Sequence, residues 1–139
     1  MNRREYFVHV IEGYLGTPYK WGGDDPLGID CSGLINEAAP LVGLLGSKED
    51  RTAEGWYQHS APIADPKTAI AGDLLFWKNA VGKVVHVEMF YAFVDGSPRS
   101  IGASGGGSGT LTVADAEKAD AFVKHHEPRP GYEVRRIFQ

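Results

Sequence analysis

The stretch that decides the fold is Gly28-Ile29-Asp30-Cys31-Ser32-Gly33-Leu34, which places a cysteine directly after a residue suited to begin a helix. An aspartate side chain accepts hydrogen bonds from the first free backbone N–H groups of a helix, so Asp30 is a good N-cap. Residues with an apolar character then recur at helical spacing as far as Pro40, and these are Cys31, Leu34, Ile35 and Ala38. We therefore expect a helix that begins at Cys31 and carries this cysteine on its inward face.

Cys31 is the only cysteine of the chain, so it forms no internal disulfide. A free cysteine serves either as a small apolar packing residue or as a reactive thiol. At a helix start, the unpaired backbone N–H groups and the positive end of the helix dipole favour the thiolate. An ionised Asp30 opposes this effect, so a nearby imidazolium would strengthen it.

His86 is the candidate for that imidazolium. It lies in residues 83–94, a run rich in valine and aromatic residues that predicts a strand buried on both faces. A histidine in such a strand is costly unless its ring nitrogens find partners. A hydrogen-bonded core histidine is one interpretation, but a cysteine at a helix start in the same small chain favours a catalytic base. Residues 16–23, with three glycines and a proline, predict an ordered loop beside a cleft.

Four blocks of the chain resemble, in the same order, the NlpC-like cysteine peptidases of bacterial cell walls and their phages, which are compact relatives of the papain fold. The blocks are Gly16-Thr17-Pro18-Tyr19-Lys20-Trp21-Gly22-Gly23, Asp30-Cys31-Ser32-Gly33-Leu34, Ala71-Gly72-Asp73-Leu74-Leu75-Phe76-Trp77 and His86-Val87-Glu88-Met89-Phe90. One block alone would be weak evidence, whereas four blocks that span nearly the whole chain are specific. The resemblance implies an α+β, papain-like fold in which N-terminal helices, with the nucleophile helix among them, pack on a central antiparallel sheet.

The resemblance also implies the chemistry. It makes Cys31 the nucleophile and His86 the general base of a cysteine endopeptidase that acts on peptidoglycan stem peptides, usually next to a D-configured glutamyl residue. Asp30 and Ser32 would be suited to hold a free peptide amine, although a plain helix cap is an equal interpretation of Asp30. The residues expected to bind substrate are Tyr19, Trp21, Asp30 and Ser32.

The family pattern breaks at its third catalytic position. This position is normally a histidine, asparagine or glutamine that orients the imidazole, and here Gly102 occupies it. By strand parity, Ser104 shares the face of Gly102 and Glu88 shares the face of His86. We prefer Ser104 as the orienting residue and take Glu88 as second choice. A backbone carbonyl or a water molecule is the third possibility.

Other segments predict ordinary elements. Helices are expected at residues 5–13, 52–57 and 115–123, and strands at 72–77, 100–104 and 132–138, with a hairpin at Asp95-Gly96. Residues 105–109 are expected to form a flexible glycine loop beside the cleft, and residues 24–27 a second loop that affects selectivity. His125 and His126 lie in a polar segment and are expected on the surface.

Composition predicts one soluble enzyme domain covering residues 1–139, because 42% apolar residues in a chain of this length can form a core. The formal charge of −4 and the lack of a basic stripe argue against a nucleic-acid partner. The five histidines are scattered and one cysteine cannot build a cysteine-rich zinc site, so we expect no metal and no cofactor. Oligomeric state is left open.

No window of the sequence approaches the roughly 20 apolar residues of a membrane span, and the first residues lack the apolar core of a secretory signal. We therefore expect synthesis in the cytoplasm and action on the cell wall by another route. A phage lysin or tail component is favoured over a trimmed secreted enzyme or an exported effector.

Two rival functions stay open. The first is a papain-like amidase or acyltransferase that uses the same pair of residues on a substrate outside the wall. The second is a catalytically impaired module that binds peptidoglycan without cutting it, and Gly102 is what keeps this rival in consideration.

Overall fold

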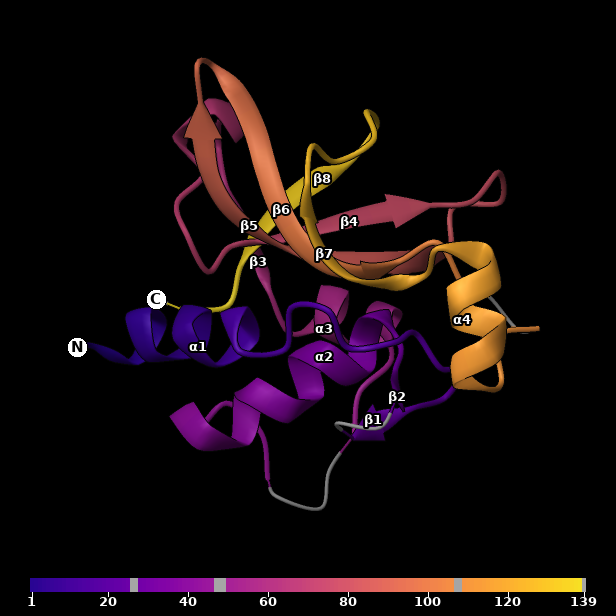
Figure 1. Cartoon of the computed structure of the whole chain (residues 1–139). Helices are drawn as coiled ribbons and strands as arrows, with labels where there is room; N and C mark the ends of the chain where they lie inside the picture. Colours follow the sequence, from indigo (N-terminus) through magenta and orange to yellow (C-terminus); the bar gives the residue numbers. More distant parts are fainter. Residues whose placement is uncertain (26–27, 47–49, 107–108, 139) are drawn as a thin grey trace.

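A six-stranded antiparallel sheet forms the centre of the protein, as the computed structural model shows for residues 1–25, 28–46, 50–106 and 109–138 (Figure 1). The spatial order of its strands is β3-β8-β4-β5-β6-β7. Their bounds are β3 (Ala61–Pro62), β4 (Leu74–Lys78), β5 (Val84–Val94), β6 (Ser97–Ser104), β7 (Phe122–His126) and β8 (Glu133–Arg136). The expected α+β architecture is confirmed.

Helices cover one side of this sheet, and Figure 1 shows α1, α2 and α3 below it, with α4 at the β7 end. A short ribbon of two strands, β1 (Asp24–Asp25) and β2 (Gly28–Ile29), precedes α2. The helices are α1 (Arg3–Glu12), α2 (Cys31–Ala38), α3 (Ala53–Gln58) and α4 (Val113–Ala119), with 3-10 turns η1 (Ala39–Val42) and η2 (Pro66–Thr68). Among the described residues, no helix is long and apolar enough to cross a membrane.

Two clusters of buried side chains lie on opposite faces of the sheet. The larger cluster joins helical residues such as Phe7 and Leu34 to Val87 and Met89 of β5. The smaller one lies on the other face of the sheet, where Phe90 packs with four further residues: Ala69, Leu75, Trp77 and Val134. Burial on both faces, which we expected for the whole of residues 83–94, is limited to the middle of β5. Near Val84 the strand pairs with β4, and near Val94 it pairs with β6.

The segment after the glycine loop differs from our expectation of a helix at residues 115–123. A capping box formed by Thr112 and Asp115 begins α4 two residues earlier, at Val113. Asp120 then adopts a left-handed conformation, with φ of 53°, and ends the helix. Residues 122–126 form β7, which pairs along its whole length with β6, because this pairing buries Val123 in the main core.

The hairpin between β5 and β6 is confirmed. Asp95 and Gly96 both have positive φ, 52° and 79°, as a tight two-residue hairpin turn requires. Strand β6 begins at Ser97 instead of residue 100, because its pairing with β5 continues up to the turn, where Ser97 pairs with Val94.

Candidate active site

Cys31 is the first residue of α2, as predicted, and its side chain is half-buried. Asp30 caps the helix by accepting a hydrogen bond from the Gly33 backbone N–H at 2.6 Å. The thiol therefore lies at the positive end of the α2 dipole, which favours a negative charge on its sulfur. The sequence pattern that predicted this helix start is confirmed.

Asp30 also fixes the loop that precedes the helix. Its second carboxylate oxygen accepts the Gly22 N–H at 3.1 Å, and its backbone N–H donates to the Gly23 carbonyl at 2.9 Å. Gly33 permits this packing, because a Cβ atom there would lie 2.1 Å from the Gly23 oxygen. Burial raises the pKa of Asp30, although the hydrogen bonds from Gly33, Ser32 and Gly22 oppose the rise.

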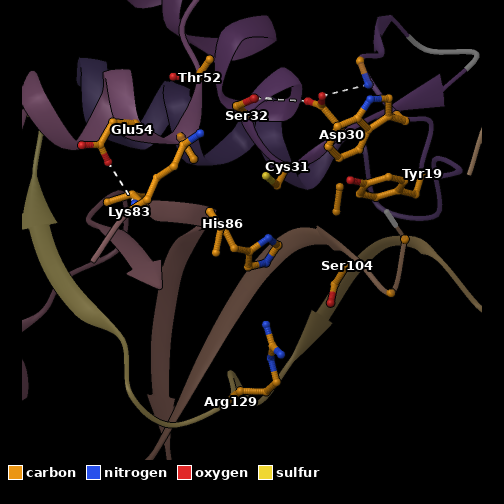
Figure 2. Close-up of a pocket in the computed structure, with 18 residues that line it drawn as sticks. Tyr19, Asp30, Cys31, Ser32, Thr52, Glu54, Lys83, His86, Ser104 and Arg129 are labelled. Atoms are coloured by element: carbon orange, nitrogen blue, oxygen red, sulfur yellow. Dashed lines mark hydrogen bonds between the residues drawn. The ribbon is translucent and has the colours of Figure 1, made fainter. Parts of the chain in front are cut away.

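Tyr19 lies on the Asp30 side of Cys31, and Figure 2 shows its hydroxyl on that side of the thiol. Its ring is buried against Gly106, where an added Cβ would lie 2.2 Å from a ring carbon. Burial, together with the negative charges of Cys31 and Asp30, raises the pKa of Tyr19 above its usual range. The phenol therefore stays protonated and can donate a hydrogen bond beside the sulfur.

His86 projects toward Cys31 from β5 (Figure 2), and an irregularity in the strand directs it there. Trp77 of β4 pairs with His86, but Lys78 pairs with Val84, so Val85 is an extra, bulged residue. The bulge explains why Val84 and Val87, three residues apart, both lie in the main core. Bulges beside functional sites commonly redirect a side chain in this way.

The imidazole of His86 lies between the thiol and a carboxylate. Its Nε2 is 2.7 Å from Oε2 of Glu88, and the Trp77 ring packs against it with centroids 5.1 Å apart. Burial lowers the pKa of His86, but hydrogen bonding and charge from Cys31 and Glu88 outweigh burial and raise it to about 9. His86 is therefore favoured as the imidazolium at neutral pH, where it can stabilise negative charge on the Cys31 sulfur.

Glu88 is a buried carboxylate with three donors. Its Oε1 accepts from Ser100 Oγ at 2.6 Å and from His126 Nε2 at 2.8 Å, in addition to the bond of Oε2 with His86. Burial raises its pKa, but the bonds from His126, His86 and Ser100 outweigh burial and lower it to about 2. Because an ionised carboxylate only accepts, both imidazoles donate through Nε2. This leaves Nδ1 of His86 for the thiol.

Gly102 makes room for Glu88. A Cβ atom on Gly102 would lie 2.3 Å from Cγ of Glu88, so no side chain fits at the family's third position while Glu88 holds its present place. The carboxylate that contacts the imidazole therefore comes from β5, the strand of His86 itself.

The structure thus departs from two of our expectations. In the part of the chain that it describes, the carboxylate that contacts His86 is that of Glu88, our second choice. Ser104 lines the cleft, and within the same residues no hydrogen bond joins it to the imidazole. His126, expected on the surface, is half-buried and bonded to Glu88. Alternation of Val123 with its polar neighbours on β7 was the one sequence signal that could have indicated this strand, and nothing local indicated Ser100.

A cleft of about 830 Å³ is lined by Tyr19, Asp30, Cys31, Ser32, His86 and Ser104 (Figure 2). Trp21 lines this cleft and is 53% exposed. Gly105 and Gly106 border the cleft, as expected for the glycine loop. Gly107 and Ser108 of that loop, and Pro26 and Leu27 of the other proposed selectivity loop, lie outside the described residues. The cleft also holds side chains that we did not predict: Thr52, Glu54, Lys83 and Arg129. Within the described residues, no group of three or more histidine, cysteine, aspartate or glutamate side chains is placed to hold a metal ion.

Comparison with known proteins identifies relatives that match parts of this chain. Dipeptidyl-peptidase 6 of Lysinibacillus sphaericus is 41% identical over 78 residues, which cover 56% of this chain and 28% of that protein. Peptidoglycan endopeptidase RipB of Mycobacterium tuberculosis is 29% identical over 128 residues, which cover 83% of this chain and 48% of that protein. The chain thus spans less than half the length of these two curated relatives.

Solved structures share the fold over nearly all of the chain. NlpC2 of Trichomonas vaginalis superposes with a TM-score of 0.72 at 25% identity, covering 99% of this chain and 48% of that one. RipD of Mycobacterium tuberculosis, described as a non-catalytic NlpC/p60 domain protein adapted to peptidoglycan binding, gives 0.71 at 18% identity, covering 99% of both chains. The model of the NlpC/P60 family matches residues 16–127, most of the sequence and all of the cysteine–histidine site, so the chain belongs to the NlpC/P60 family.

Proposed function

We propose that this protein is a cysteine endopeptidase that hydrolyses a peptide bond in peptidoglycan stem peptides. One observation carries the proposal: the imidazole of His86 lies between the Cys31 thiol and the Glu88 carboxylate, with Nε2 held at 2.7 Å. A nucleophile, a base beside it and a group that orients the base are the minimum that acyl transfer by a thiol requires.

The reaction begins with the Cys31 thiolate, which attacks the scissile carbonyl carbon and forms a tetrahedral oxyanion. Backbone N–H groups at the start of α2 are placed to stabilise this oxyanion, and the protonated Tyr19 hydroxyl is a further donor beside the sulfur. The His86 imidazolium then gives its proton to the leaving amine as the C–N bond breaks. The products of this half-reaction are a free amine and a thioester on Cys31.

Hydrolysis of the thioester reverses the roles. Neutral His86 takes a proton from water through Nδ1, and the resulting hydroxide attacks the thioester carbonyl. The C–S bond breaks, the carboxylic acid product leaves, and the thiolate–imidazolium pair is restored. Glu88 holds the required tautomer throughout, because its ionised carboxylate accepts from Nε2–H in both half-reactions.

The wall peptide is the substrate that the relatives favour. Several are named for this chemistry, among them RipB and the bifunctional muramidase/DL-endopeptidase CwlT of Bacillus subtilis. In this chain, Asp30 and Ser32 lie at one end of the cleft, where a carboxylate and a hydroxyl can hold a peptide amine. Delivery by a phage particle or by another export route stays a prediction.

The binding module remains the second candidate, since RipD shares the fold and is described as non-catalytic. Gly102 favours that alternative, whereas the contact of Glu88 with His86 favours catalysis.

Mass spectrometry of purified peptidoglycan and of a defined stem peptide, each incubated with wild type, Cys31→Ala and His86→Ala, tests the proposal. We expect new fragments from wild type alone, and the fragment masses identify the bond. Intact substrate in all three samples, with wall binding retained by Cys31→Ala, would replace the peptidase with the binding module. Turnover of a small amide but not of wall peptide would favour the papain-like amidase.

A further inference from the structure

We infer that His126 is a positioning residue of this active site, which acts on His86 through the shared carboxylate of Glu88. The inference rests on the proposed function, because a positioning role requires a reaction at Cys31. It extends the site from β5 to β7, a strand that contributes no residue to the reaction steps proposed above.

The geometry places two imidazoles on one carboxylate. Oε2 of Glu88 lies 2.7 Å from Nε2 of His86, and Oε1 lies 2.8 Å from Nε2 of His126. Each carboxylate oxygen thus has its own imidazole, so the plane of the carboxylate is fixed at both ends. Without His126, only the Ser100 hydroxyl would hold Oε1.

The fold explains why these groups meet. Strand β6 lies between β5 and β7 in the sheet (Figure 1), so side chains from β5 and β7 are normally separated by the side chains of β6. Gly102 removes that barrier, and Glu88 lies in the space above it. Two residues before Gly102 on β6, Ser100 pairs with His126 of β7. The Ser100 hydroxyl donates to Oε1 of Glu88 at 2.6 Å, the oxygen that His126 also contacts.

Burial makes the contact consequential. Glu88 is 2% exposed, and an ionised carboxylate in such a place is costly unless donors surround it. A hydrogen bond to a charged group contributes about 1.5–3 kcal/mol, which corresponds to roughly tenfold to a hundredfold in an equilibrium or a rate. Removing the His126 donor therefore weakens the hold on Glu88, and through it the orientation of His86.

Three variants test the inference. His126→Leu removes the donor, and His126→Gln keeps an N–H donor near the position of Nε2. His125→Leu is the matched control, because His125 is the neighbouring residue on β7, is exposed and packs on the ring of Tyr91 instead of Glu88. We expect kcat to fall about tenfold in His126→Leu with KM within twofold of wild type, whereas His126→Gln and His125→Leu retain most of kcat.

A double-variant comparison shows whether the effect passes through Glu88. If it does, His126→Leu has little further effect on kcat in a Glu88→Gln background. Equal losses of kcat in both backgrounds, or no loss in the wild-type background, would overturn the inference. A rise of KM without loss of kcat would overturn it as well, because that result assigns His126 to substrate binding.

A substrate-free measurement separates this inference from the proposed function. At pH 6 an unperturbed thiol is less than about 1% thiolate, so the rate of Cys31 alkylation by iodoacetamide reports the thiolate–imidazolium pair. We expect fast alkylation in wild type and His126→Gln, and at least roughly threefold slower alkylation in His126→Leu. Wild type no faster than a free thiol would overturn the proposed function, and this inference with it. Fast alkylation that His126→Leu leaves unchanged would overturn the inference alone.

Discussion

The Glu88 side chain fills the space above Gly102, where an added Cβ would lie 2.3 Å from Cγ of the glutamate. The two residues therefore depend on each other: the glycine leaves a gap in β6, and the carboxylate from β5 crosses it. In the NlpC-like family that the sequence resembles, this place normally carries a polar side chain. Here the carboxylate that contacts His86 comes from the neighbouring strand.

Glu88→Gln is expected to lower kcat by about a hundredfold or more with little change in KM, because a neutral amide holds the imidazolium less well. Ser104→Ala is the matched comparison, since Ser104 lines the same cleft, and we expect its kcat to stay within about threefold of wild type. Steady-state kinetics on a defined stem peptide decides between them. A larger loss for Ser104→Ala than for Glu88→Gln would restore Ser104 as the orienting residue.

The stability of the fold should depend on pH through the same carboxylate. The pKa of Glu88 is lowered from 4.5 to about 2, so its contribution is fully present above pH 4.5 and is lost as pH falls from 4.5 toward 2. We expect Glu88→Gln to be less stable than wild type by a few kcal/mol at pH 7, and the difference to shrink at pH 3.

Thermal unfolding at the two pH values measures this difference. Glu127→Gln is the control, because Glu127 is an exposed carboxylate next to His126 and its removal should change the melting temperature equally little at both pH values. A constant gap between wild type and Glu88→Gln from pH 7 to pH 3 would contradict the assignment of the lowered pKa to Glu88.

Local sequence signals predicted the nucleophile side of the site. The cap residue Asp30, the apolar spacing after Cys31 and the valine-rich run around His86 all act within a few residues, and the structure follows them. The bulge at Val85 left no such signal, because only the pairing of β5 with β4 reveals it.

The orienting side of the site could not be predicted, because cross-strand register decides it. Strand parity allowed both Ser104 and Glu88, and only the packing of β5 against β6 shows that Glu88 lies over Gly102. His126 was misplaced for a related reason. Its strand β7 is polar at one end, and its pairing with Ser100 depends on a chain reversal at Asp120 that the sequence did not indicate.

Asp30 has two roles that substitution can separate. Asp30→Asn keeps an oxygen to accept from Gly33 N–H but loses the charge and the second acceptor for Gly22 N–H, so we expect a smaller drop in melting temperature than for Asp30→Ala. If Asp30 also holds a peptide amine, KM rises for a peptide with a free amino terminus and stays unchanged for its N-acetylated form. Asp30→Ala should destabilise the fold by about 1 kcal/mol or more through loss of the cap. An unchanged KM in Asp30→Asn would leave Asp30 as a helix cap alone.

The exchange between Glu88 and Gly102 should be reversible by design. Gly102→His alone places a ring where Glu88 lies, so we expect an unstable and inactive protein, since overfilling a packed site costs about 1–3 kcal/mol or more. Glu88→Ala alone opens the space but leaves His86 without its acceptor. The double variant Glu88→Ala/Gly102→His restores a polar group beside His86 from the strand that normally supplies it.

We expect the double variant to recover at least about tenfold in kcat over Glu88→Ala, because one hydrogen bond to the imidazole is regained. Glu88→Ala/Gly102→Leu is the control, since leucine fills a similar volume without a ring nitrogen, and it should recover stability without recovering kcat. Equal recovery by leucine would mean that Glu88 supports the fold around His86 but does not orient it. No recovery by histidine, with a melting temperature near wild type, would mean that the charge of the carboxylate is required and that Glu88 does more than fix the ring.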